Sequence, residues 1–108
     1  MYWRGFNLEL VQVASKEDVP LGKMKAVEVK GTSILLVNLD GEYYAIGNKC
    51  THRGCKLSNG TLNGEIVKCP CHGSRFNVKT GEAVGGPAAK PEQKYEVKTE
   101  QDQIQINV

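Results

Sequence analysis

Hydrophobic and polar residues alternate with a period of two along much of the chain, and no long stretch shows a helical period. Such alternation is typical of β-strands with one buried face. The alternating apolar residues are Val27, Val29, Tyr95, Val97, Ile104, Ile106 and Val108. Near the start, Leu8 and Leu10 share one phase while Val11 and Val13 take the other, which indicates a β-bulge. The pattern predicts a small all-β domain.

One run, Ser33–Leu39, is apolar at successive positions and therefore predicts a central strand that is buried on both faces. Asp40-Gly41 follows it directly and precedes a second strand-like run, which is a strong signal for a tight hairpin. Asn59-Gly60, Asn63-Gly64 and Thr80-Gly81 predict further tight turns.

Residues 49–90 differ in composition from the rest of the chain. They hold all four Cys, both His and seven of the twelve Gly, with fewer strand-like runs. We therefore expect a single domain over 1–108, in which a loop-rich subdomain at about 49–90 is inserted into a β base formed by 1–48 and 91–108. We expect something other than a hydrophobic core to hold this subdomain together.

Length and charge exclude several classes of protein. A chain of 108 residues has room for one core, and a net charge of +2 is too balanced for a dedicated nucleic-acid binder. The longest apolar run, Ile34–Val37, is far below the roughly 20 residues that span a bilayer. The first ten residues contain no signal-peptide core. We expect a cytoplasmic monomer without a membrane span.

Two short motifs carry the chemistry. The first, residues 50–55, reads C-T-H-R-G-C, and the second, residues 69–74, reads C-P-C-H-G-S. Each offers a thiolate and an imidazole at short range, so we expect the two loops to bind one metal centre between them. A structural zinc site is one alternative. Against zinc, Cys and His alternate along the chain, and Cys55 and Cys71 have no place in a tetrahedral site.

These motifs resemble the signature of Rieske proteins, which bind a [2Fe–2S] cluster with two His in place of two Cys on one iron. Within that family the chain is similar to the small soluble Rieske ferredoxins, and among these it resembles the archaeal sulredoxin type. The resemblance implies an antiparallel β-sandwich base beneath a loop-rich cluster-binding subdomain. It further implies that Cys50 and Cys69 ligate one iron, and that His52 and His72 ligate the other.

The same resemblance implies roles for residues around the cluster. Cys55 and Cys71 match a pair that forms a loop-bridging disulfide in the high-potential branch of the family; the alternative is two reduced, buried thiols. Ser74 matches a serine whose hydroxyl donates to a bridging sulfide, and Phe76 stands where a Tyr donor is usual. The expected surroundings of the cluster are Gly54, Gly73, Ser74, Phe76 and the Gly85–Ala88 segment with Pro87.

Charge counting indicates how such a centre behaves. Two ferric irons, two sulfides and two thiolates sum to zero when both imidazoles are neutral, so we expect a midpoint within about −150 to +300 mV. Each imidazole keeps one free ring nitrogen, which couples reduction to protonation. Since no coordination position is open, we expect an electron carrier rather than an enzyme.

The expected partners are a reductase and an oxygenase or cytochrome. Arg53, Lys56 and Arg75 flank the ligand loops, either as solvated charges or as a patch that steers an acidic redox partner. Three other functions stay open at this point: an electron-transfer subunit of a larger oxidoreductase, a structural zinc module, and a redox sensor that uses Cys55 and Cys71.

Overall fold

The computed structural model describes residues 10–51, 54–71, 73–86 and 90–107, and this part of the chain folds into ten strands and two short 3₁₀ helices. The elements are β1 (Leu10–Ser15), η1 (Lys16–Asp18), β2 (Met24–Val29), β3 (Thr32–Leu39), β4 (Glu42–Gly47), η2 (Leu57–Asn59), β5 (Thr61–Asn63), β6 (Ile66–Lys68), β7 (Arg75–Asn77), β8 (Ala83–Gly85), β9 (Lys94–Glu100) and β10 (Gln103–Asn107). The prediction of an all-β protein is confirmed.

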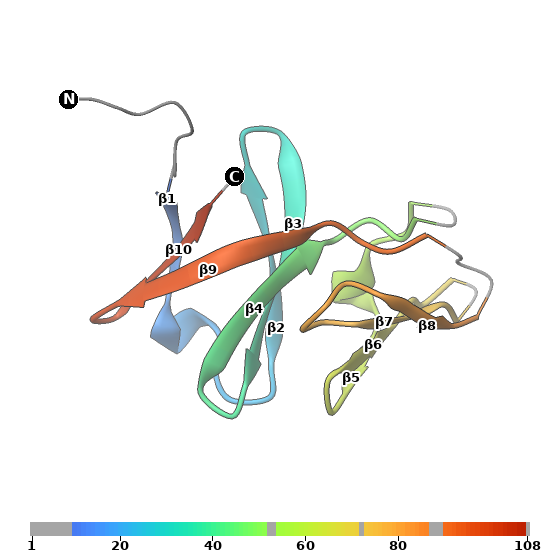
Figure 1. Ribbon diagram of the computed structural model, residues 1–108. Coiled ribbons are helices and arrows are strands. Elements are labelled where there is room, and N and C mark those ends of the chain that lie inside the picture. The colour runs from blue at the N-terminus through green and yellow to red at the C-terminus, as the bar shows by residue number, and fades with distance from the viewer. Residues whose placement is uncertain (1–9, 52–53, 72, 87–89, 108) are drawn as a thin grey trace.

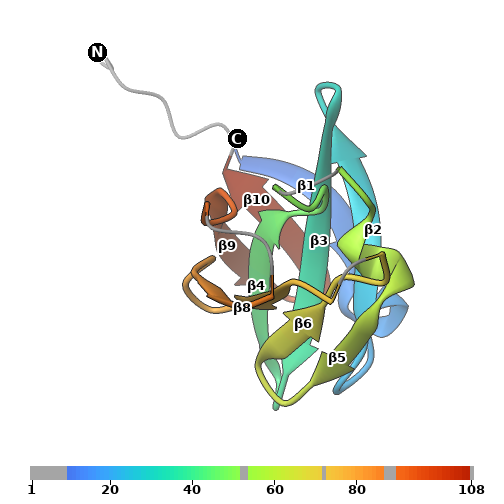
Figure 2. The ribbon, with the colours of Figure 1, turned by 90° about the vertical axis from the view of Figure 1, so that its right-hand side faces the viewer.

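The strands form two antiparallel sheets that lie side by side (Figure 1). The larger sheet has six strands in the order β1-β10-β9-β4-β3-β2, so both ends of the described chain contribute to it. The smaller sheet has the order β5-β6-β7-β8. Figure 2 shows from a second direction how the smaller sheet lies across β3 and β4. The first motif loop follows β4 of the larger sheet, whereas the second joins β6 to β7 of the smaller sheet.

The predicted hairpin joins β3 to β4. Asp40 and Gly41 both have positive φ, at 54° and 93°, as a two-residue hairpin turn requires. Asn38 is buried beneath this turn, and its side chain holds the turn in place. Its Oδ1 accepts the N–H of Gly41 at 2.9 Å, and its Nδ2 donates to the carbonyl of Val19 at 2.8 Å. One buried amide therefore ties the turn to the segment after η1.

Strand β3 is buried on both faces, because its alternate residues enter two different cores. The prediction of a single core from the length of the chain is therefore wrong. Ile34 and Leu36 join a core within the base sheet, and Leu35 and Val37 join a core between the base and the smaller sheet. The first core also contains Ala14, Val19, Val29, Ala45, Ile104 and Ile106; the second also contains Ile46, Cys50, Leu57, Val67, Cys69, Phe76 and Val78. In strand order β3 is second from the edge rather than central. Its second buried face comes from the smaller sheet.

The expectation that the 49–90 region lacks a hydrophobic core is wrong. Val67, Phe76 and Val78 are fully buried and pack with Leu35 and Ile46 of the base. The apolar residues of this region are few and separated by turns, so their common burial shows only once the strands pair. The smaller sheet is therefore fastened to the base by apolar packing as well as by its loops.

The structure also confirms the predictions of a β-bulge near the N-terminus and of strands near the C-terminus. A register shift between Gln12 and Ala14 in the β1–β10 pairing confirms the bulge, although Leu8 lies outside the described residues. The alternating residues near the C-terminus form β9 and β10, in which Ile104 and Ile106 are fully buried. Within the described residues, no helix is long and apolar enough to cross a bilayer.

Gly60, just after η2, fills a position with no room for a side chain, because an added Cβ would collide with the carbonyl of Lys68. We expect Gly60→Ala to lower the free energy of unfolding by about 1–3 kcal/mol, measured by urea denaturation. Gly85→Ala is the control: its Cβ would meet only the Arg75 side chain, with Nη1 at 3.3 Å, and that side chain can move aside. Equal losses in the two variants would contradict this explanation.

Candidate metal centre

The two motif loops are closed by the same pair of backbone hydrogen bonds. In the first loop, the N–H of Cys50 donates to the carbonyl of Cys55 at 2.7 Å, and the N–H of Gly54 donates to the carbonyl of Cys50 at 2.7 Å. In the second loop, Cys69 donates to Ser74 at 2.7 Å, and Gly73 donates to Cys69 at 3.2 Å. The loops are thus two copies of one turn, each starting at a Cys.

Gly54 and Gly73 occupy equivalent positions in these turns, and each has φ of 77°. A residue with a Cβ is strained in this left-handed region, so glycine lets each chain reverse within five residues. The two glycines that the sequence placed beside the cluster therefore shape the loops that present the cysteines.

Cys50 and Cys69 are buried free thiols, with 3% and 2% of their surface exposed. Both belong to the core between the two sheets, beside Phe76. The sulfur atoms of Cys55, Cys69 and Cys71 lie within 4.8 Å of one another. Cys50 belongs to the first loop, together with Cys55. His52, His72 and Pro87 lie outside the described residues.

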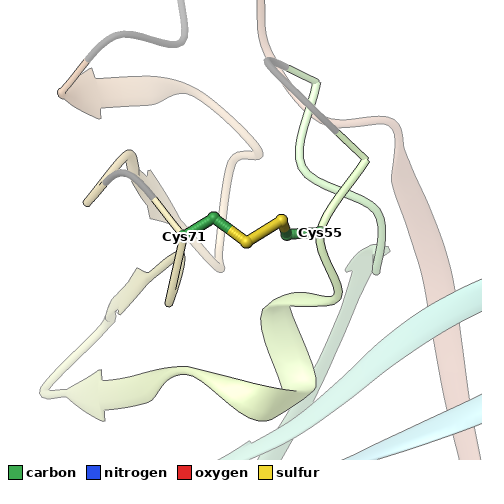
Figure 3. Close-up of a disulfide and its surroundings, with 2 residues drawn as sticks. All are labelled: Cys55 and Cys71. Carbon is green, nitrogen blue, oxygen red and sulfur yellow. A yellow bond between two sulfur atoms is a disulfide. The ribbon is translucent and has the colours of Figure 1, made fainter.

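A disulfide joins Cys55 of the first loop to Cys71 of the second, with the two Cα atoms 6.4 Å apart (Figure 3). Of the two alternatives for this pair, the structure contains the bonded one. A disulfide sulfur is not available as a thiolate. Cys50 and Cys69 are free cysteines, one in each loop, and this arrangement fits a centre that takes one cysteine from each loop.

Residues next to the second loop pack tightly against it. Ser74 and Phe76 are fully buried, and the benzyl ring of Phe76 has no hydrogen-bond donor. Gly86 has φ of 79°, and a Cβ there would come within 2.5 Å of Ser74 Cα and 2.7 Å of the Gly73 carbonyl oxygen. The backbone that leads toward Pro87 therefore lies directly on the second loop.

Sequence reasoning missed Glu92, which is 93% buried beside the first loop, with 7% of its surface exposed. Gly47 leaves room for it, because a Cβ there would come within 2.6 Å of Glu92 Oε1. Burial raises the pKa of Glu92 to about 7, although the N–H of Thr51 donates to its carboxylate and opposes this rise. Nothing in the sequence separates this glutamate from those at the surface, because its burial depends on a distant glycine.

Thr51, between the first cysteine and His52, is held from two sides. Besides its N–H bond to Glu92, its hydroxyl donates to the carbonyl of Lys90 at 2.8 Å. The segment that leads into β9 therefore fixes the first loop, as Gly86 fixes the second. Within the described residues, Glu92 Oε2 is buried without a hydrogen-bond partner.

Removing the disulfide is expected to destabilise the protein. Cys55 and Cys71 are 16 residues apart, and opening a loop of about that length costs roughly 3 kcal/mol through the entropy of the unfolded chain. We expect this loss in the double variant Cys55→Ala/Cys71→Ala, measured by urea denaturation. A reductant should destabilise the parent chain similarly and leave the double variant unchanged. A further loss in the double variant would show that the reductant acts elsewhere.

Glu92 is expected to make stability depend on pH. Its pKa rises from 4.5 to about 7 on folding, so the folded state binds more protons between these values. Stability therefore falls as pH rises from about 4.5 to about 7 and levels off above that, by at most about 3 kcal/mol. Urea unfolding across this range should show the fall in the parent chain and not in Glu92→Gln. The control Glu96→Gln, at an exposed position on β9, should keep the parent profile.

Comparison with known proteins gives this arrangement its family. Residues 9–100 match the Rieske [2Fe-2S] domain. The chain is 37% identical over 98 residues to the ferredoxin component of the naphthalene 1,2-dioxygenase/salicylate 5-hydroxylase systems of a Ralstonia species, which covers 91% of this chain and 94% of that one.

Solved structures agree. The ferredoxin of carbazole 1,9a-dioxygenase from Nocardioides aromaticivorans IC177 superposes with a TM-score of 0.87 at 30% identity, covering 91% of this chain and 96% of its own. A chain in the complex of reduced oxygenase and oxidized ferredoxin in carbazole 1,9a-dioxygenase also gives a TM-score of 0.87, at 29% identity and 94% coverage of both chains.

These matches decide between the two metals that the motifs left open. The zinc alternative is wrong, because the matched family binds an iron–sulfur cluster and the match spans both motifs. The two buried free thiols, one in each loop, fit the two cysteine ligands of such a cluster. The chain belongs to the Rieske [2Fe–2S] family, and its cofactor is one Rieske-type cluster.

Proposed function

We propose that the chain is the ferredoxin component of an oxygenase system, which receives one electron at a time from a reductase and delivers it to the oxygenase. The observation that carries this proposal is the pair of matched loops, each with one buried free thiol, in a chain that covers 94% of a dioxygenase ferredoxin. The related ferredoxin in complex with its oxygenase supports the choice of partner. We place this exchange in the cytoplasm, as the sequence predicts.

The ligand assignment is part of the proposal. Cys50 and Cys69 would hold one iron, and His52 and His72 the other. The bound cluster supplies a reversible one-electron couple between its diferric state and a state with one ferrous iron. The buried position of both cysteines in the core between the sheets keeps water from their sulfurs. Two thiolates and two neutral imidazoles leave the oxidised centre without net charge, which favours uptake of an electron.

Two buried residues near Cys69 determine which side-chain hydrogen-bond donors the cluster would have. A hydroxyl at Ser74 stabilises the added negative charge by donating a hydrogen bond, whereas Phe76 offers none. We therefore assign Ser74 a potential-raising role and Phe76 a potential-lowering one relative to a Tyr.

We propose that the chain catalyses no reaction of its own. Two protein donors and the bridging sulfides complete the coordination of each iron, so no position remains for a substrate. Substrate chemistry is thereby left to the oxygenase. The ferredoxin relatives and the paired ferredoxin–oxygenase structure support this division of roles.

A redox titration across pH 5 to 10, followed by visible absorbance, tests the function. We expect a coloured protein with a one-electron midpoint between about −150 and +300 mV. We also expect the midpoint to fall by about 59 mV per pH unit where a ligand imidazole loses its proton, since one proton then accompanies one electron.

Substitution of His72 by Cys is the matched variant for this titration. A third thiolate adds one negative charge, so a cluster that assembles should have a lower midpoint and a weaker alkaline slope. A colourless parent protein without a redox wave, produced with iron available, would overturn the proposed function.

A further inference from the structure

Each ligand loop is flanked by two cations, one just before it and one just after it, and the two residues pair with each other. Lys49 and Lys56 pair in an antiparallel bridge just outside Cys50 and Cys55. Lys68 and Arg75 pair between β6 and β7, just outside the second loop. All four side chains are exposed. We refer to these four residues as the neck cations.

Such pairing works against folding, because like charges directly opposite each other on paired strands repel. Within the described part of the chain, no carboxylate forms an ion pair with a neck cation. The ion pair found among residues 10–51, 54–71, 73–86 and 90–107 joins Lys79 to Glu65 at 3.5 Å and includes no neck cation. Two unneutralised pairs at equivalent places in two loops therefore call for a role outside folding.

The neck cations are the centre of a wider separation of charge. Residues 49–90 contain seven Lys and Arg against two Glu, whereas the rest of the chain contains seven against ten Asp and Glu. The formal charge is thus +5 over residues 49–90 and −3 over the rest of the sequence, although the whole chain carries only +2. The molecule is a dipole whose positive end contains the ligand loops.

Two of the neck cations lie against the second loop and against the nearby Gly85 of β8. The Cε of Lys68 is 3.4 Å from where a Cβ of Gly73 would stand, and Lys68 lines a surface hollow with Cys69 and Cys71. The Nη1 of Arg75 is 3.3 Å from where a Cβ of Gly85 would stand. These charges therefore border the surface nearest the cluster.

We propose that the neck cations are a docking surface for a partner protein that presents carboxylates around its own electron-exchange site. This inference rests on the proposed function, because it identifies the chemistry of the redox partner's surface. An acidic face would neutralise four like charges that form no ion pair within the described residues, and the dipole would turn the cluster end toward that face. The negative base disfavours binding of the same partner in any other orientation.

Two double variants of equal net charge test the proposal. The first, Lys56→Glu/Lys68→Glu, changes two neck cations and is called the neck variant. The second, Lys25→Glu/Lys98→Glu, changes two exposed lysines of the base and is called the base variant. Both have a formal net charge of −2, since each exchanges two cations for two anions in a chain of +2. If binding depends on the total charge, both variants should change equally. If it depends on a local docking surface, only the neck variant should change.

The first readout is electron exchange with small ions of opposite charge. Each reduced protein gives one electron either to hexacyanoferrate(III), forming hexacyanoferrate(II), or to tris(phenanthroline)cobalt(III), forming the cobalt(II) complex. Salt is raised from about 0.01 to about 1 M, which shortens the Debye length from about 30 to about 3 Å. We expect the rate with hexacyanoferrate to fall with salt in the parent chain and the base variant.

In the neck variant the four neck positions sum to zero and residues 49–90 keep a formal charge of only +1, so that rate should hardly change with salt. At low salt it should be about tenfold below the parent rate. The cobalt complex should show the opposite trends. Equal changes in both variants would overturn the proposal, as would a shift in midpoint without a change in salt dependence. The latter result would assign the neck cations to tuning the cluster rather than to docking.

The second readout needs no cluster. Binding of fluorescein-labelled poly-L-glutamate, followed by anisotropy at low salt, should be strong for the parent chain and the base variant and weak for the neck variant. Failure of the chain to take up iron would reject the proposed function while this measurement still decides the docking surface. Equal binding by all three proteins would reject the docking surface.

Thermal unfolding separates docking from a structural role. Lys56→Glu places a carboxylate opposite Lys49 and removes a like-charge contact, so we expect its melting temperature to rise while poly-L-glutamate binding weakens. A lower melting temperature with retained binding would show that Lys56 serves the fold.

Discussion

Burial of both faces of β3 is the constraint on which the rest of the structure depends. One set of its side chains closes the core of the base, and the alternate set closes the core that holds the smaller sheet and both free cysteines. The two cores share a backbone, so a one-residue slip of β3 would exchange their residues and disrupt both. The ligand loops thus take their position from a strand that contains no ligand.

The sequence predicted the base and the chemistry of the centre well, because both are encoded locally. Alternation, the Asp40-Gly41 turn and the Cys–His spacings each lie within a few consecutive residues. The smaller sheet was missed because its four strands have three residues each, too few to show a period. The burial of Glu92 and the pairing of Lys56 with Lys49 and of Arg75 with Lys68 were missed for a different reason: burial and register bring their neighbours from elsewhere in the chain.

The proposed centre would combine residues with opposite effects on its reduction potential. The disulfide between Cys55 and Cys71 and the buried Ser74 resemble the high-potential branch of the family. The buried Phe76, in contrast, offers no hydrogen-bond donor. A formal charge of +5 over residues 49–90 would further stabilise an added electron. We therefore expect hydrogen bonds, local charge and burial to set the potential together, rather than any single residue.

The short distance between the Cys69 sulfur and the bridge beside it bears on how the protein matures. All three sulfurs lie within 4.8 Å, which places a free thiol where it can attack the disulfide and exchange with it. Exchange would free Cys55 or Cys71 and consume the cysteine that iron needs. If Cys69 held iron, as proposed, its sulfur would no longer be free to attack, and metal loading would protect the cross-link from scrambling. The cross-link would in turn keep Cys55 and Cys71 from offering thiolates to the metal.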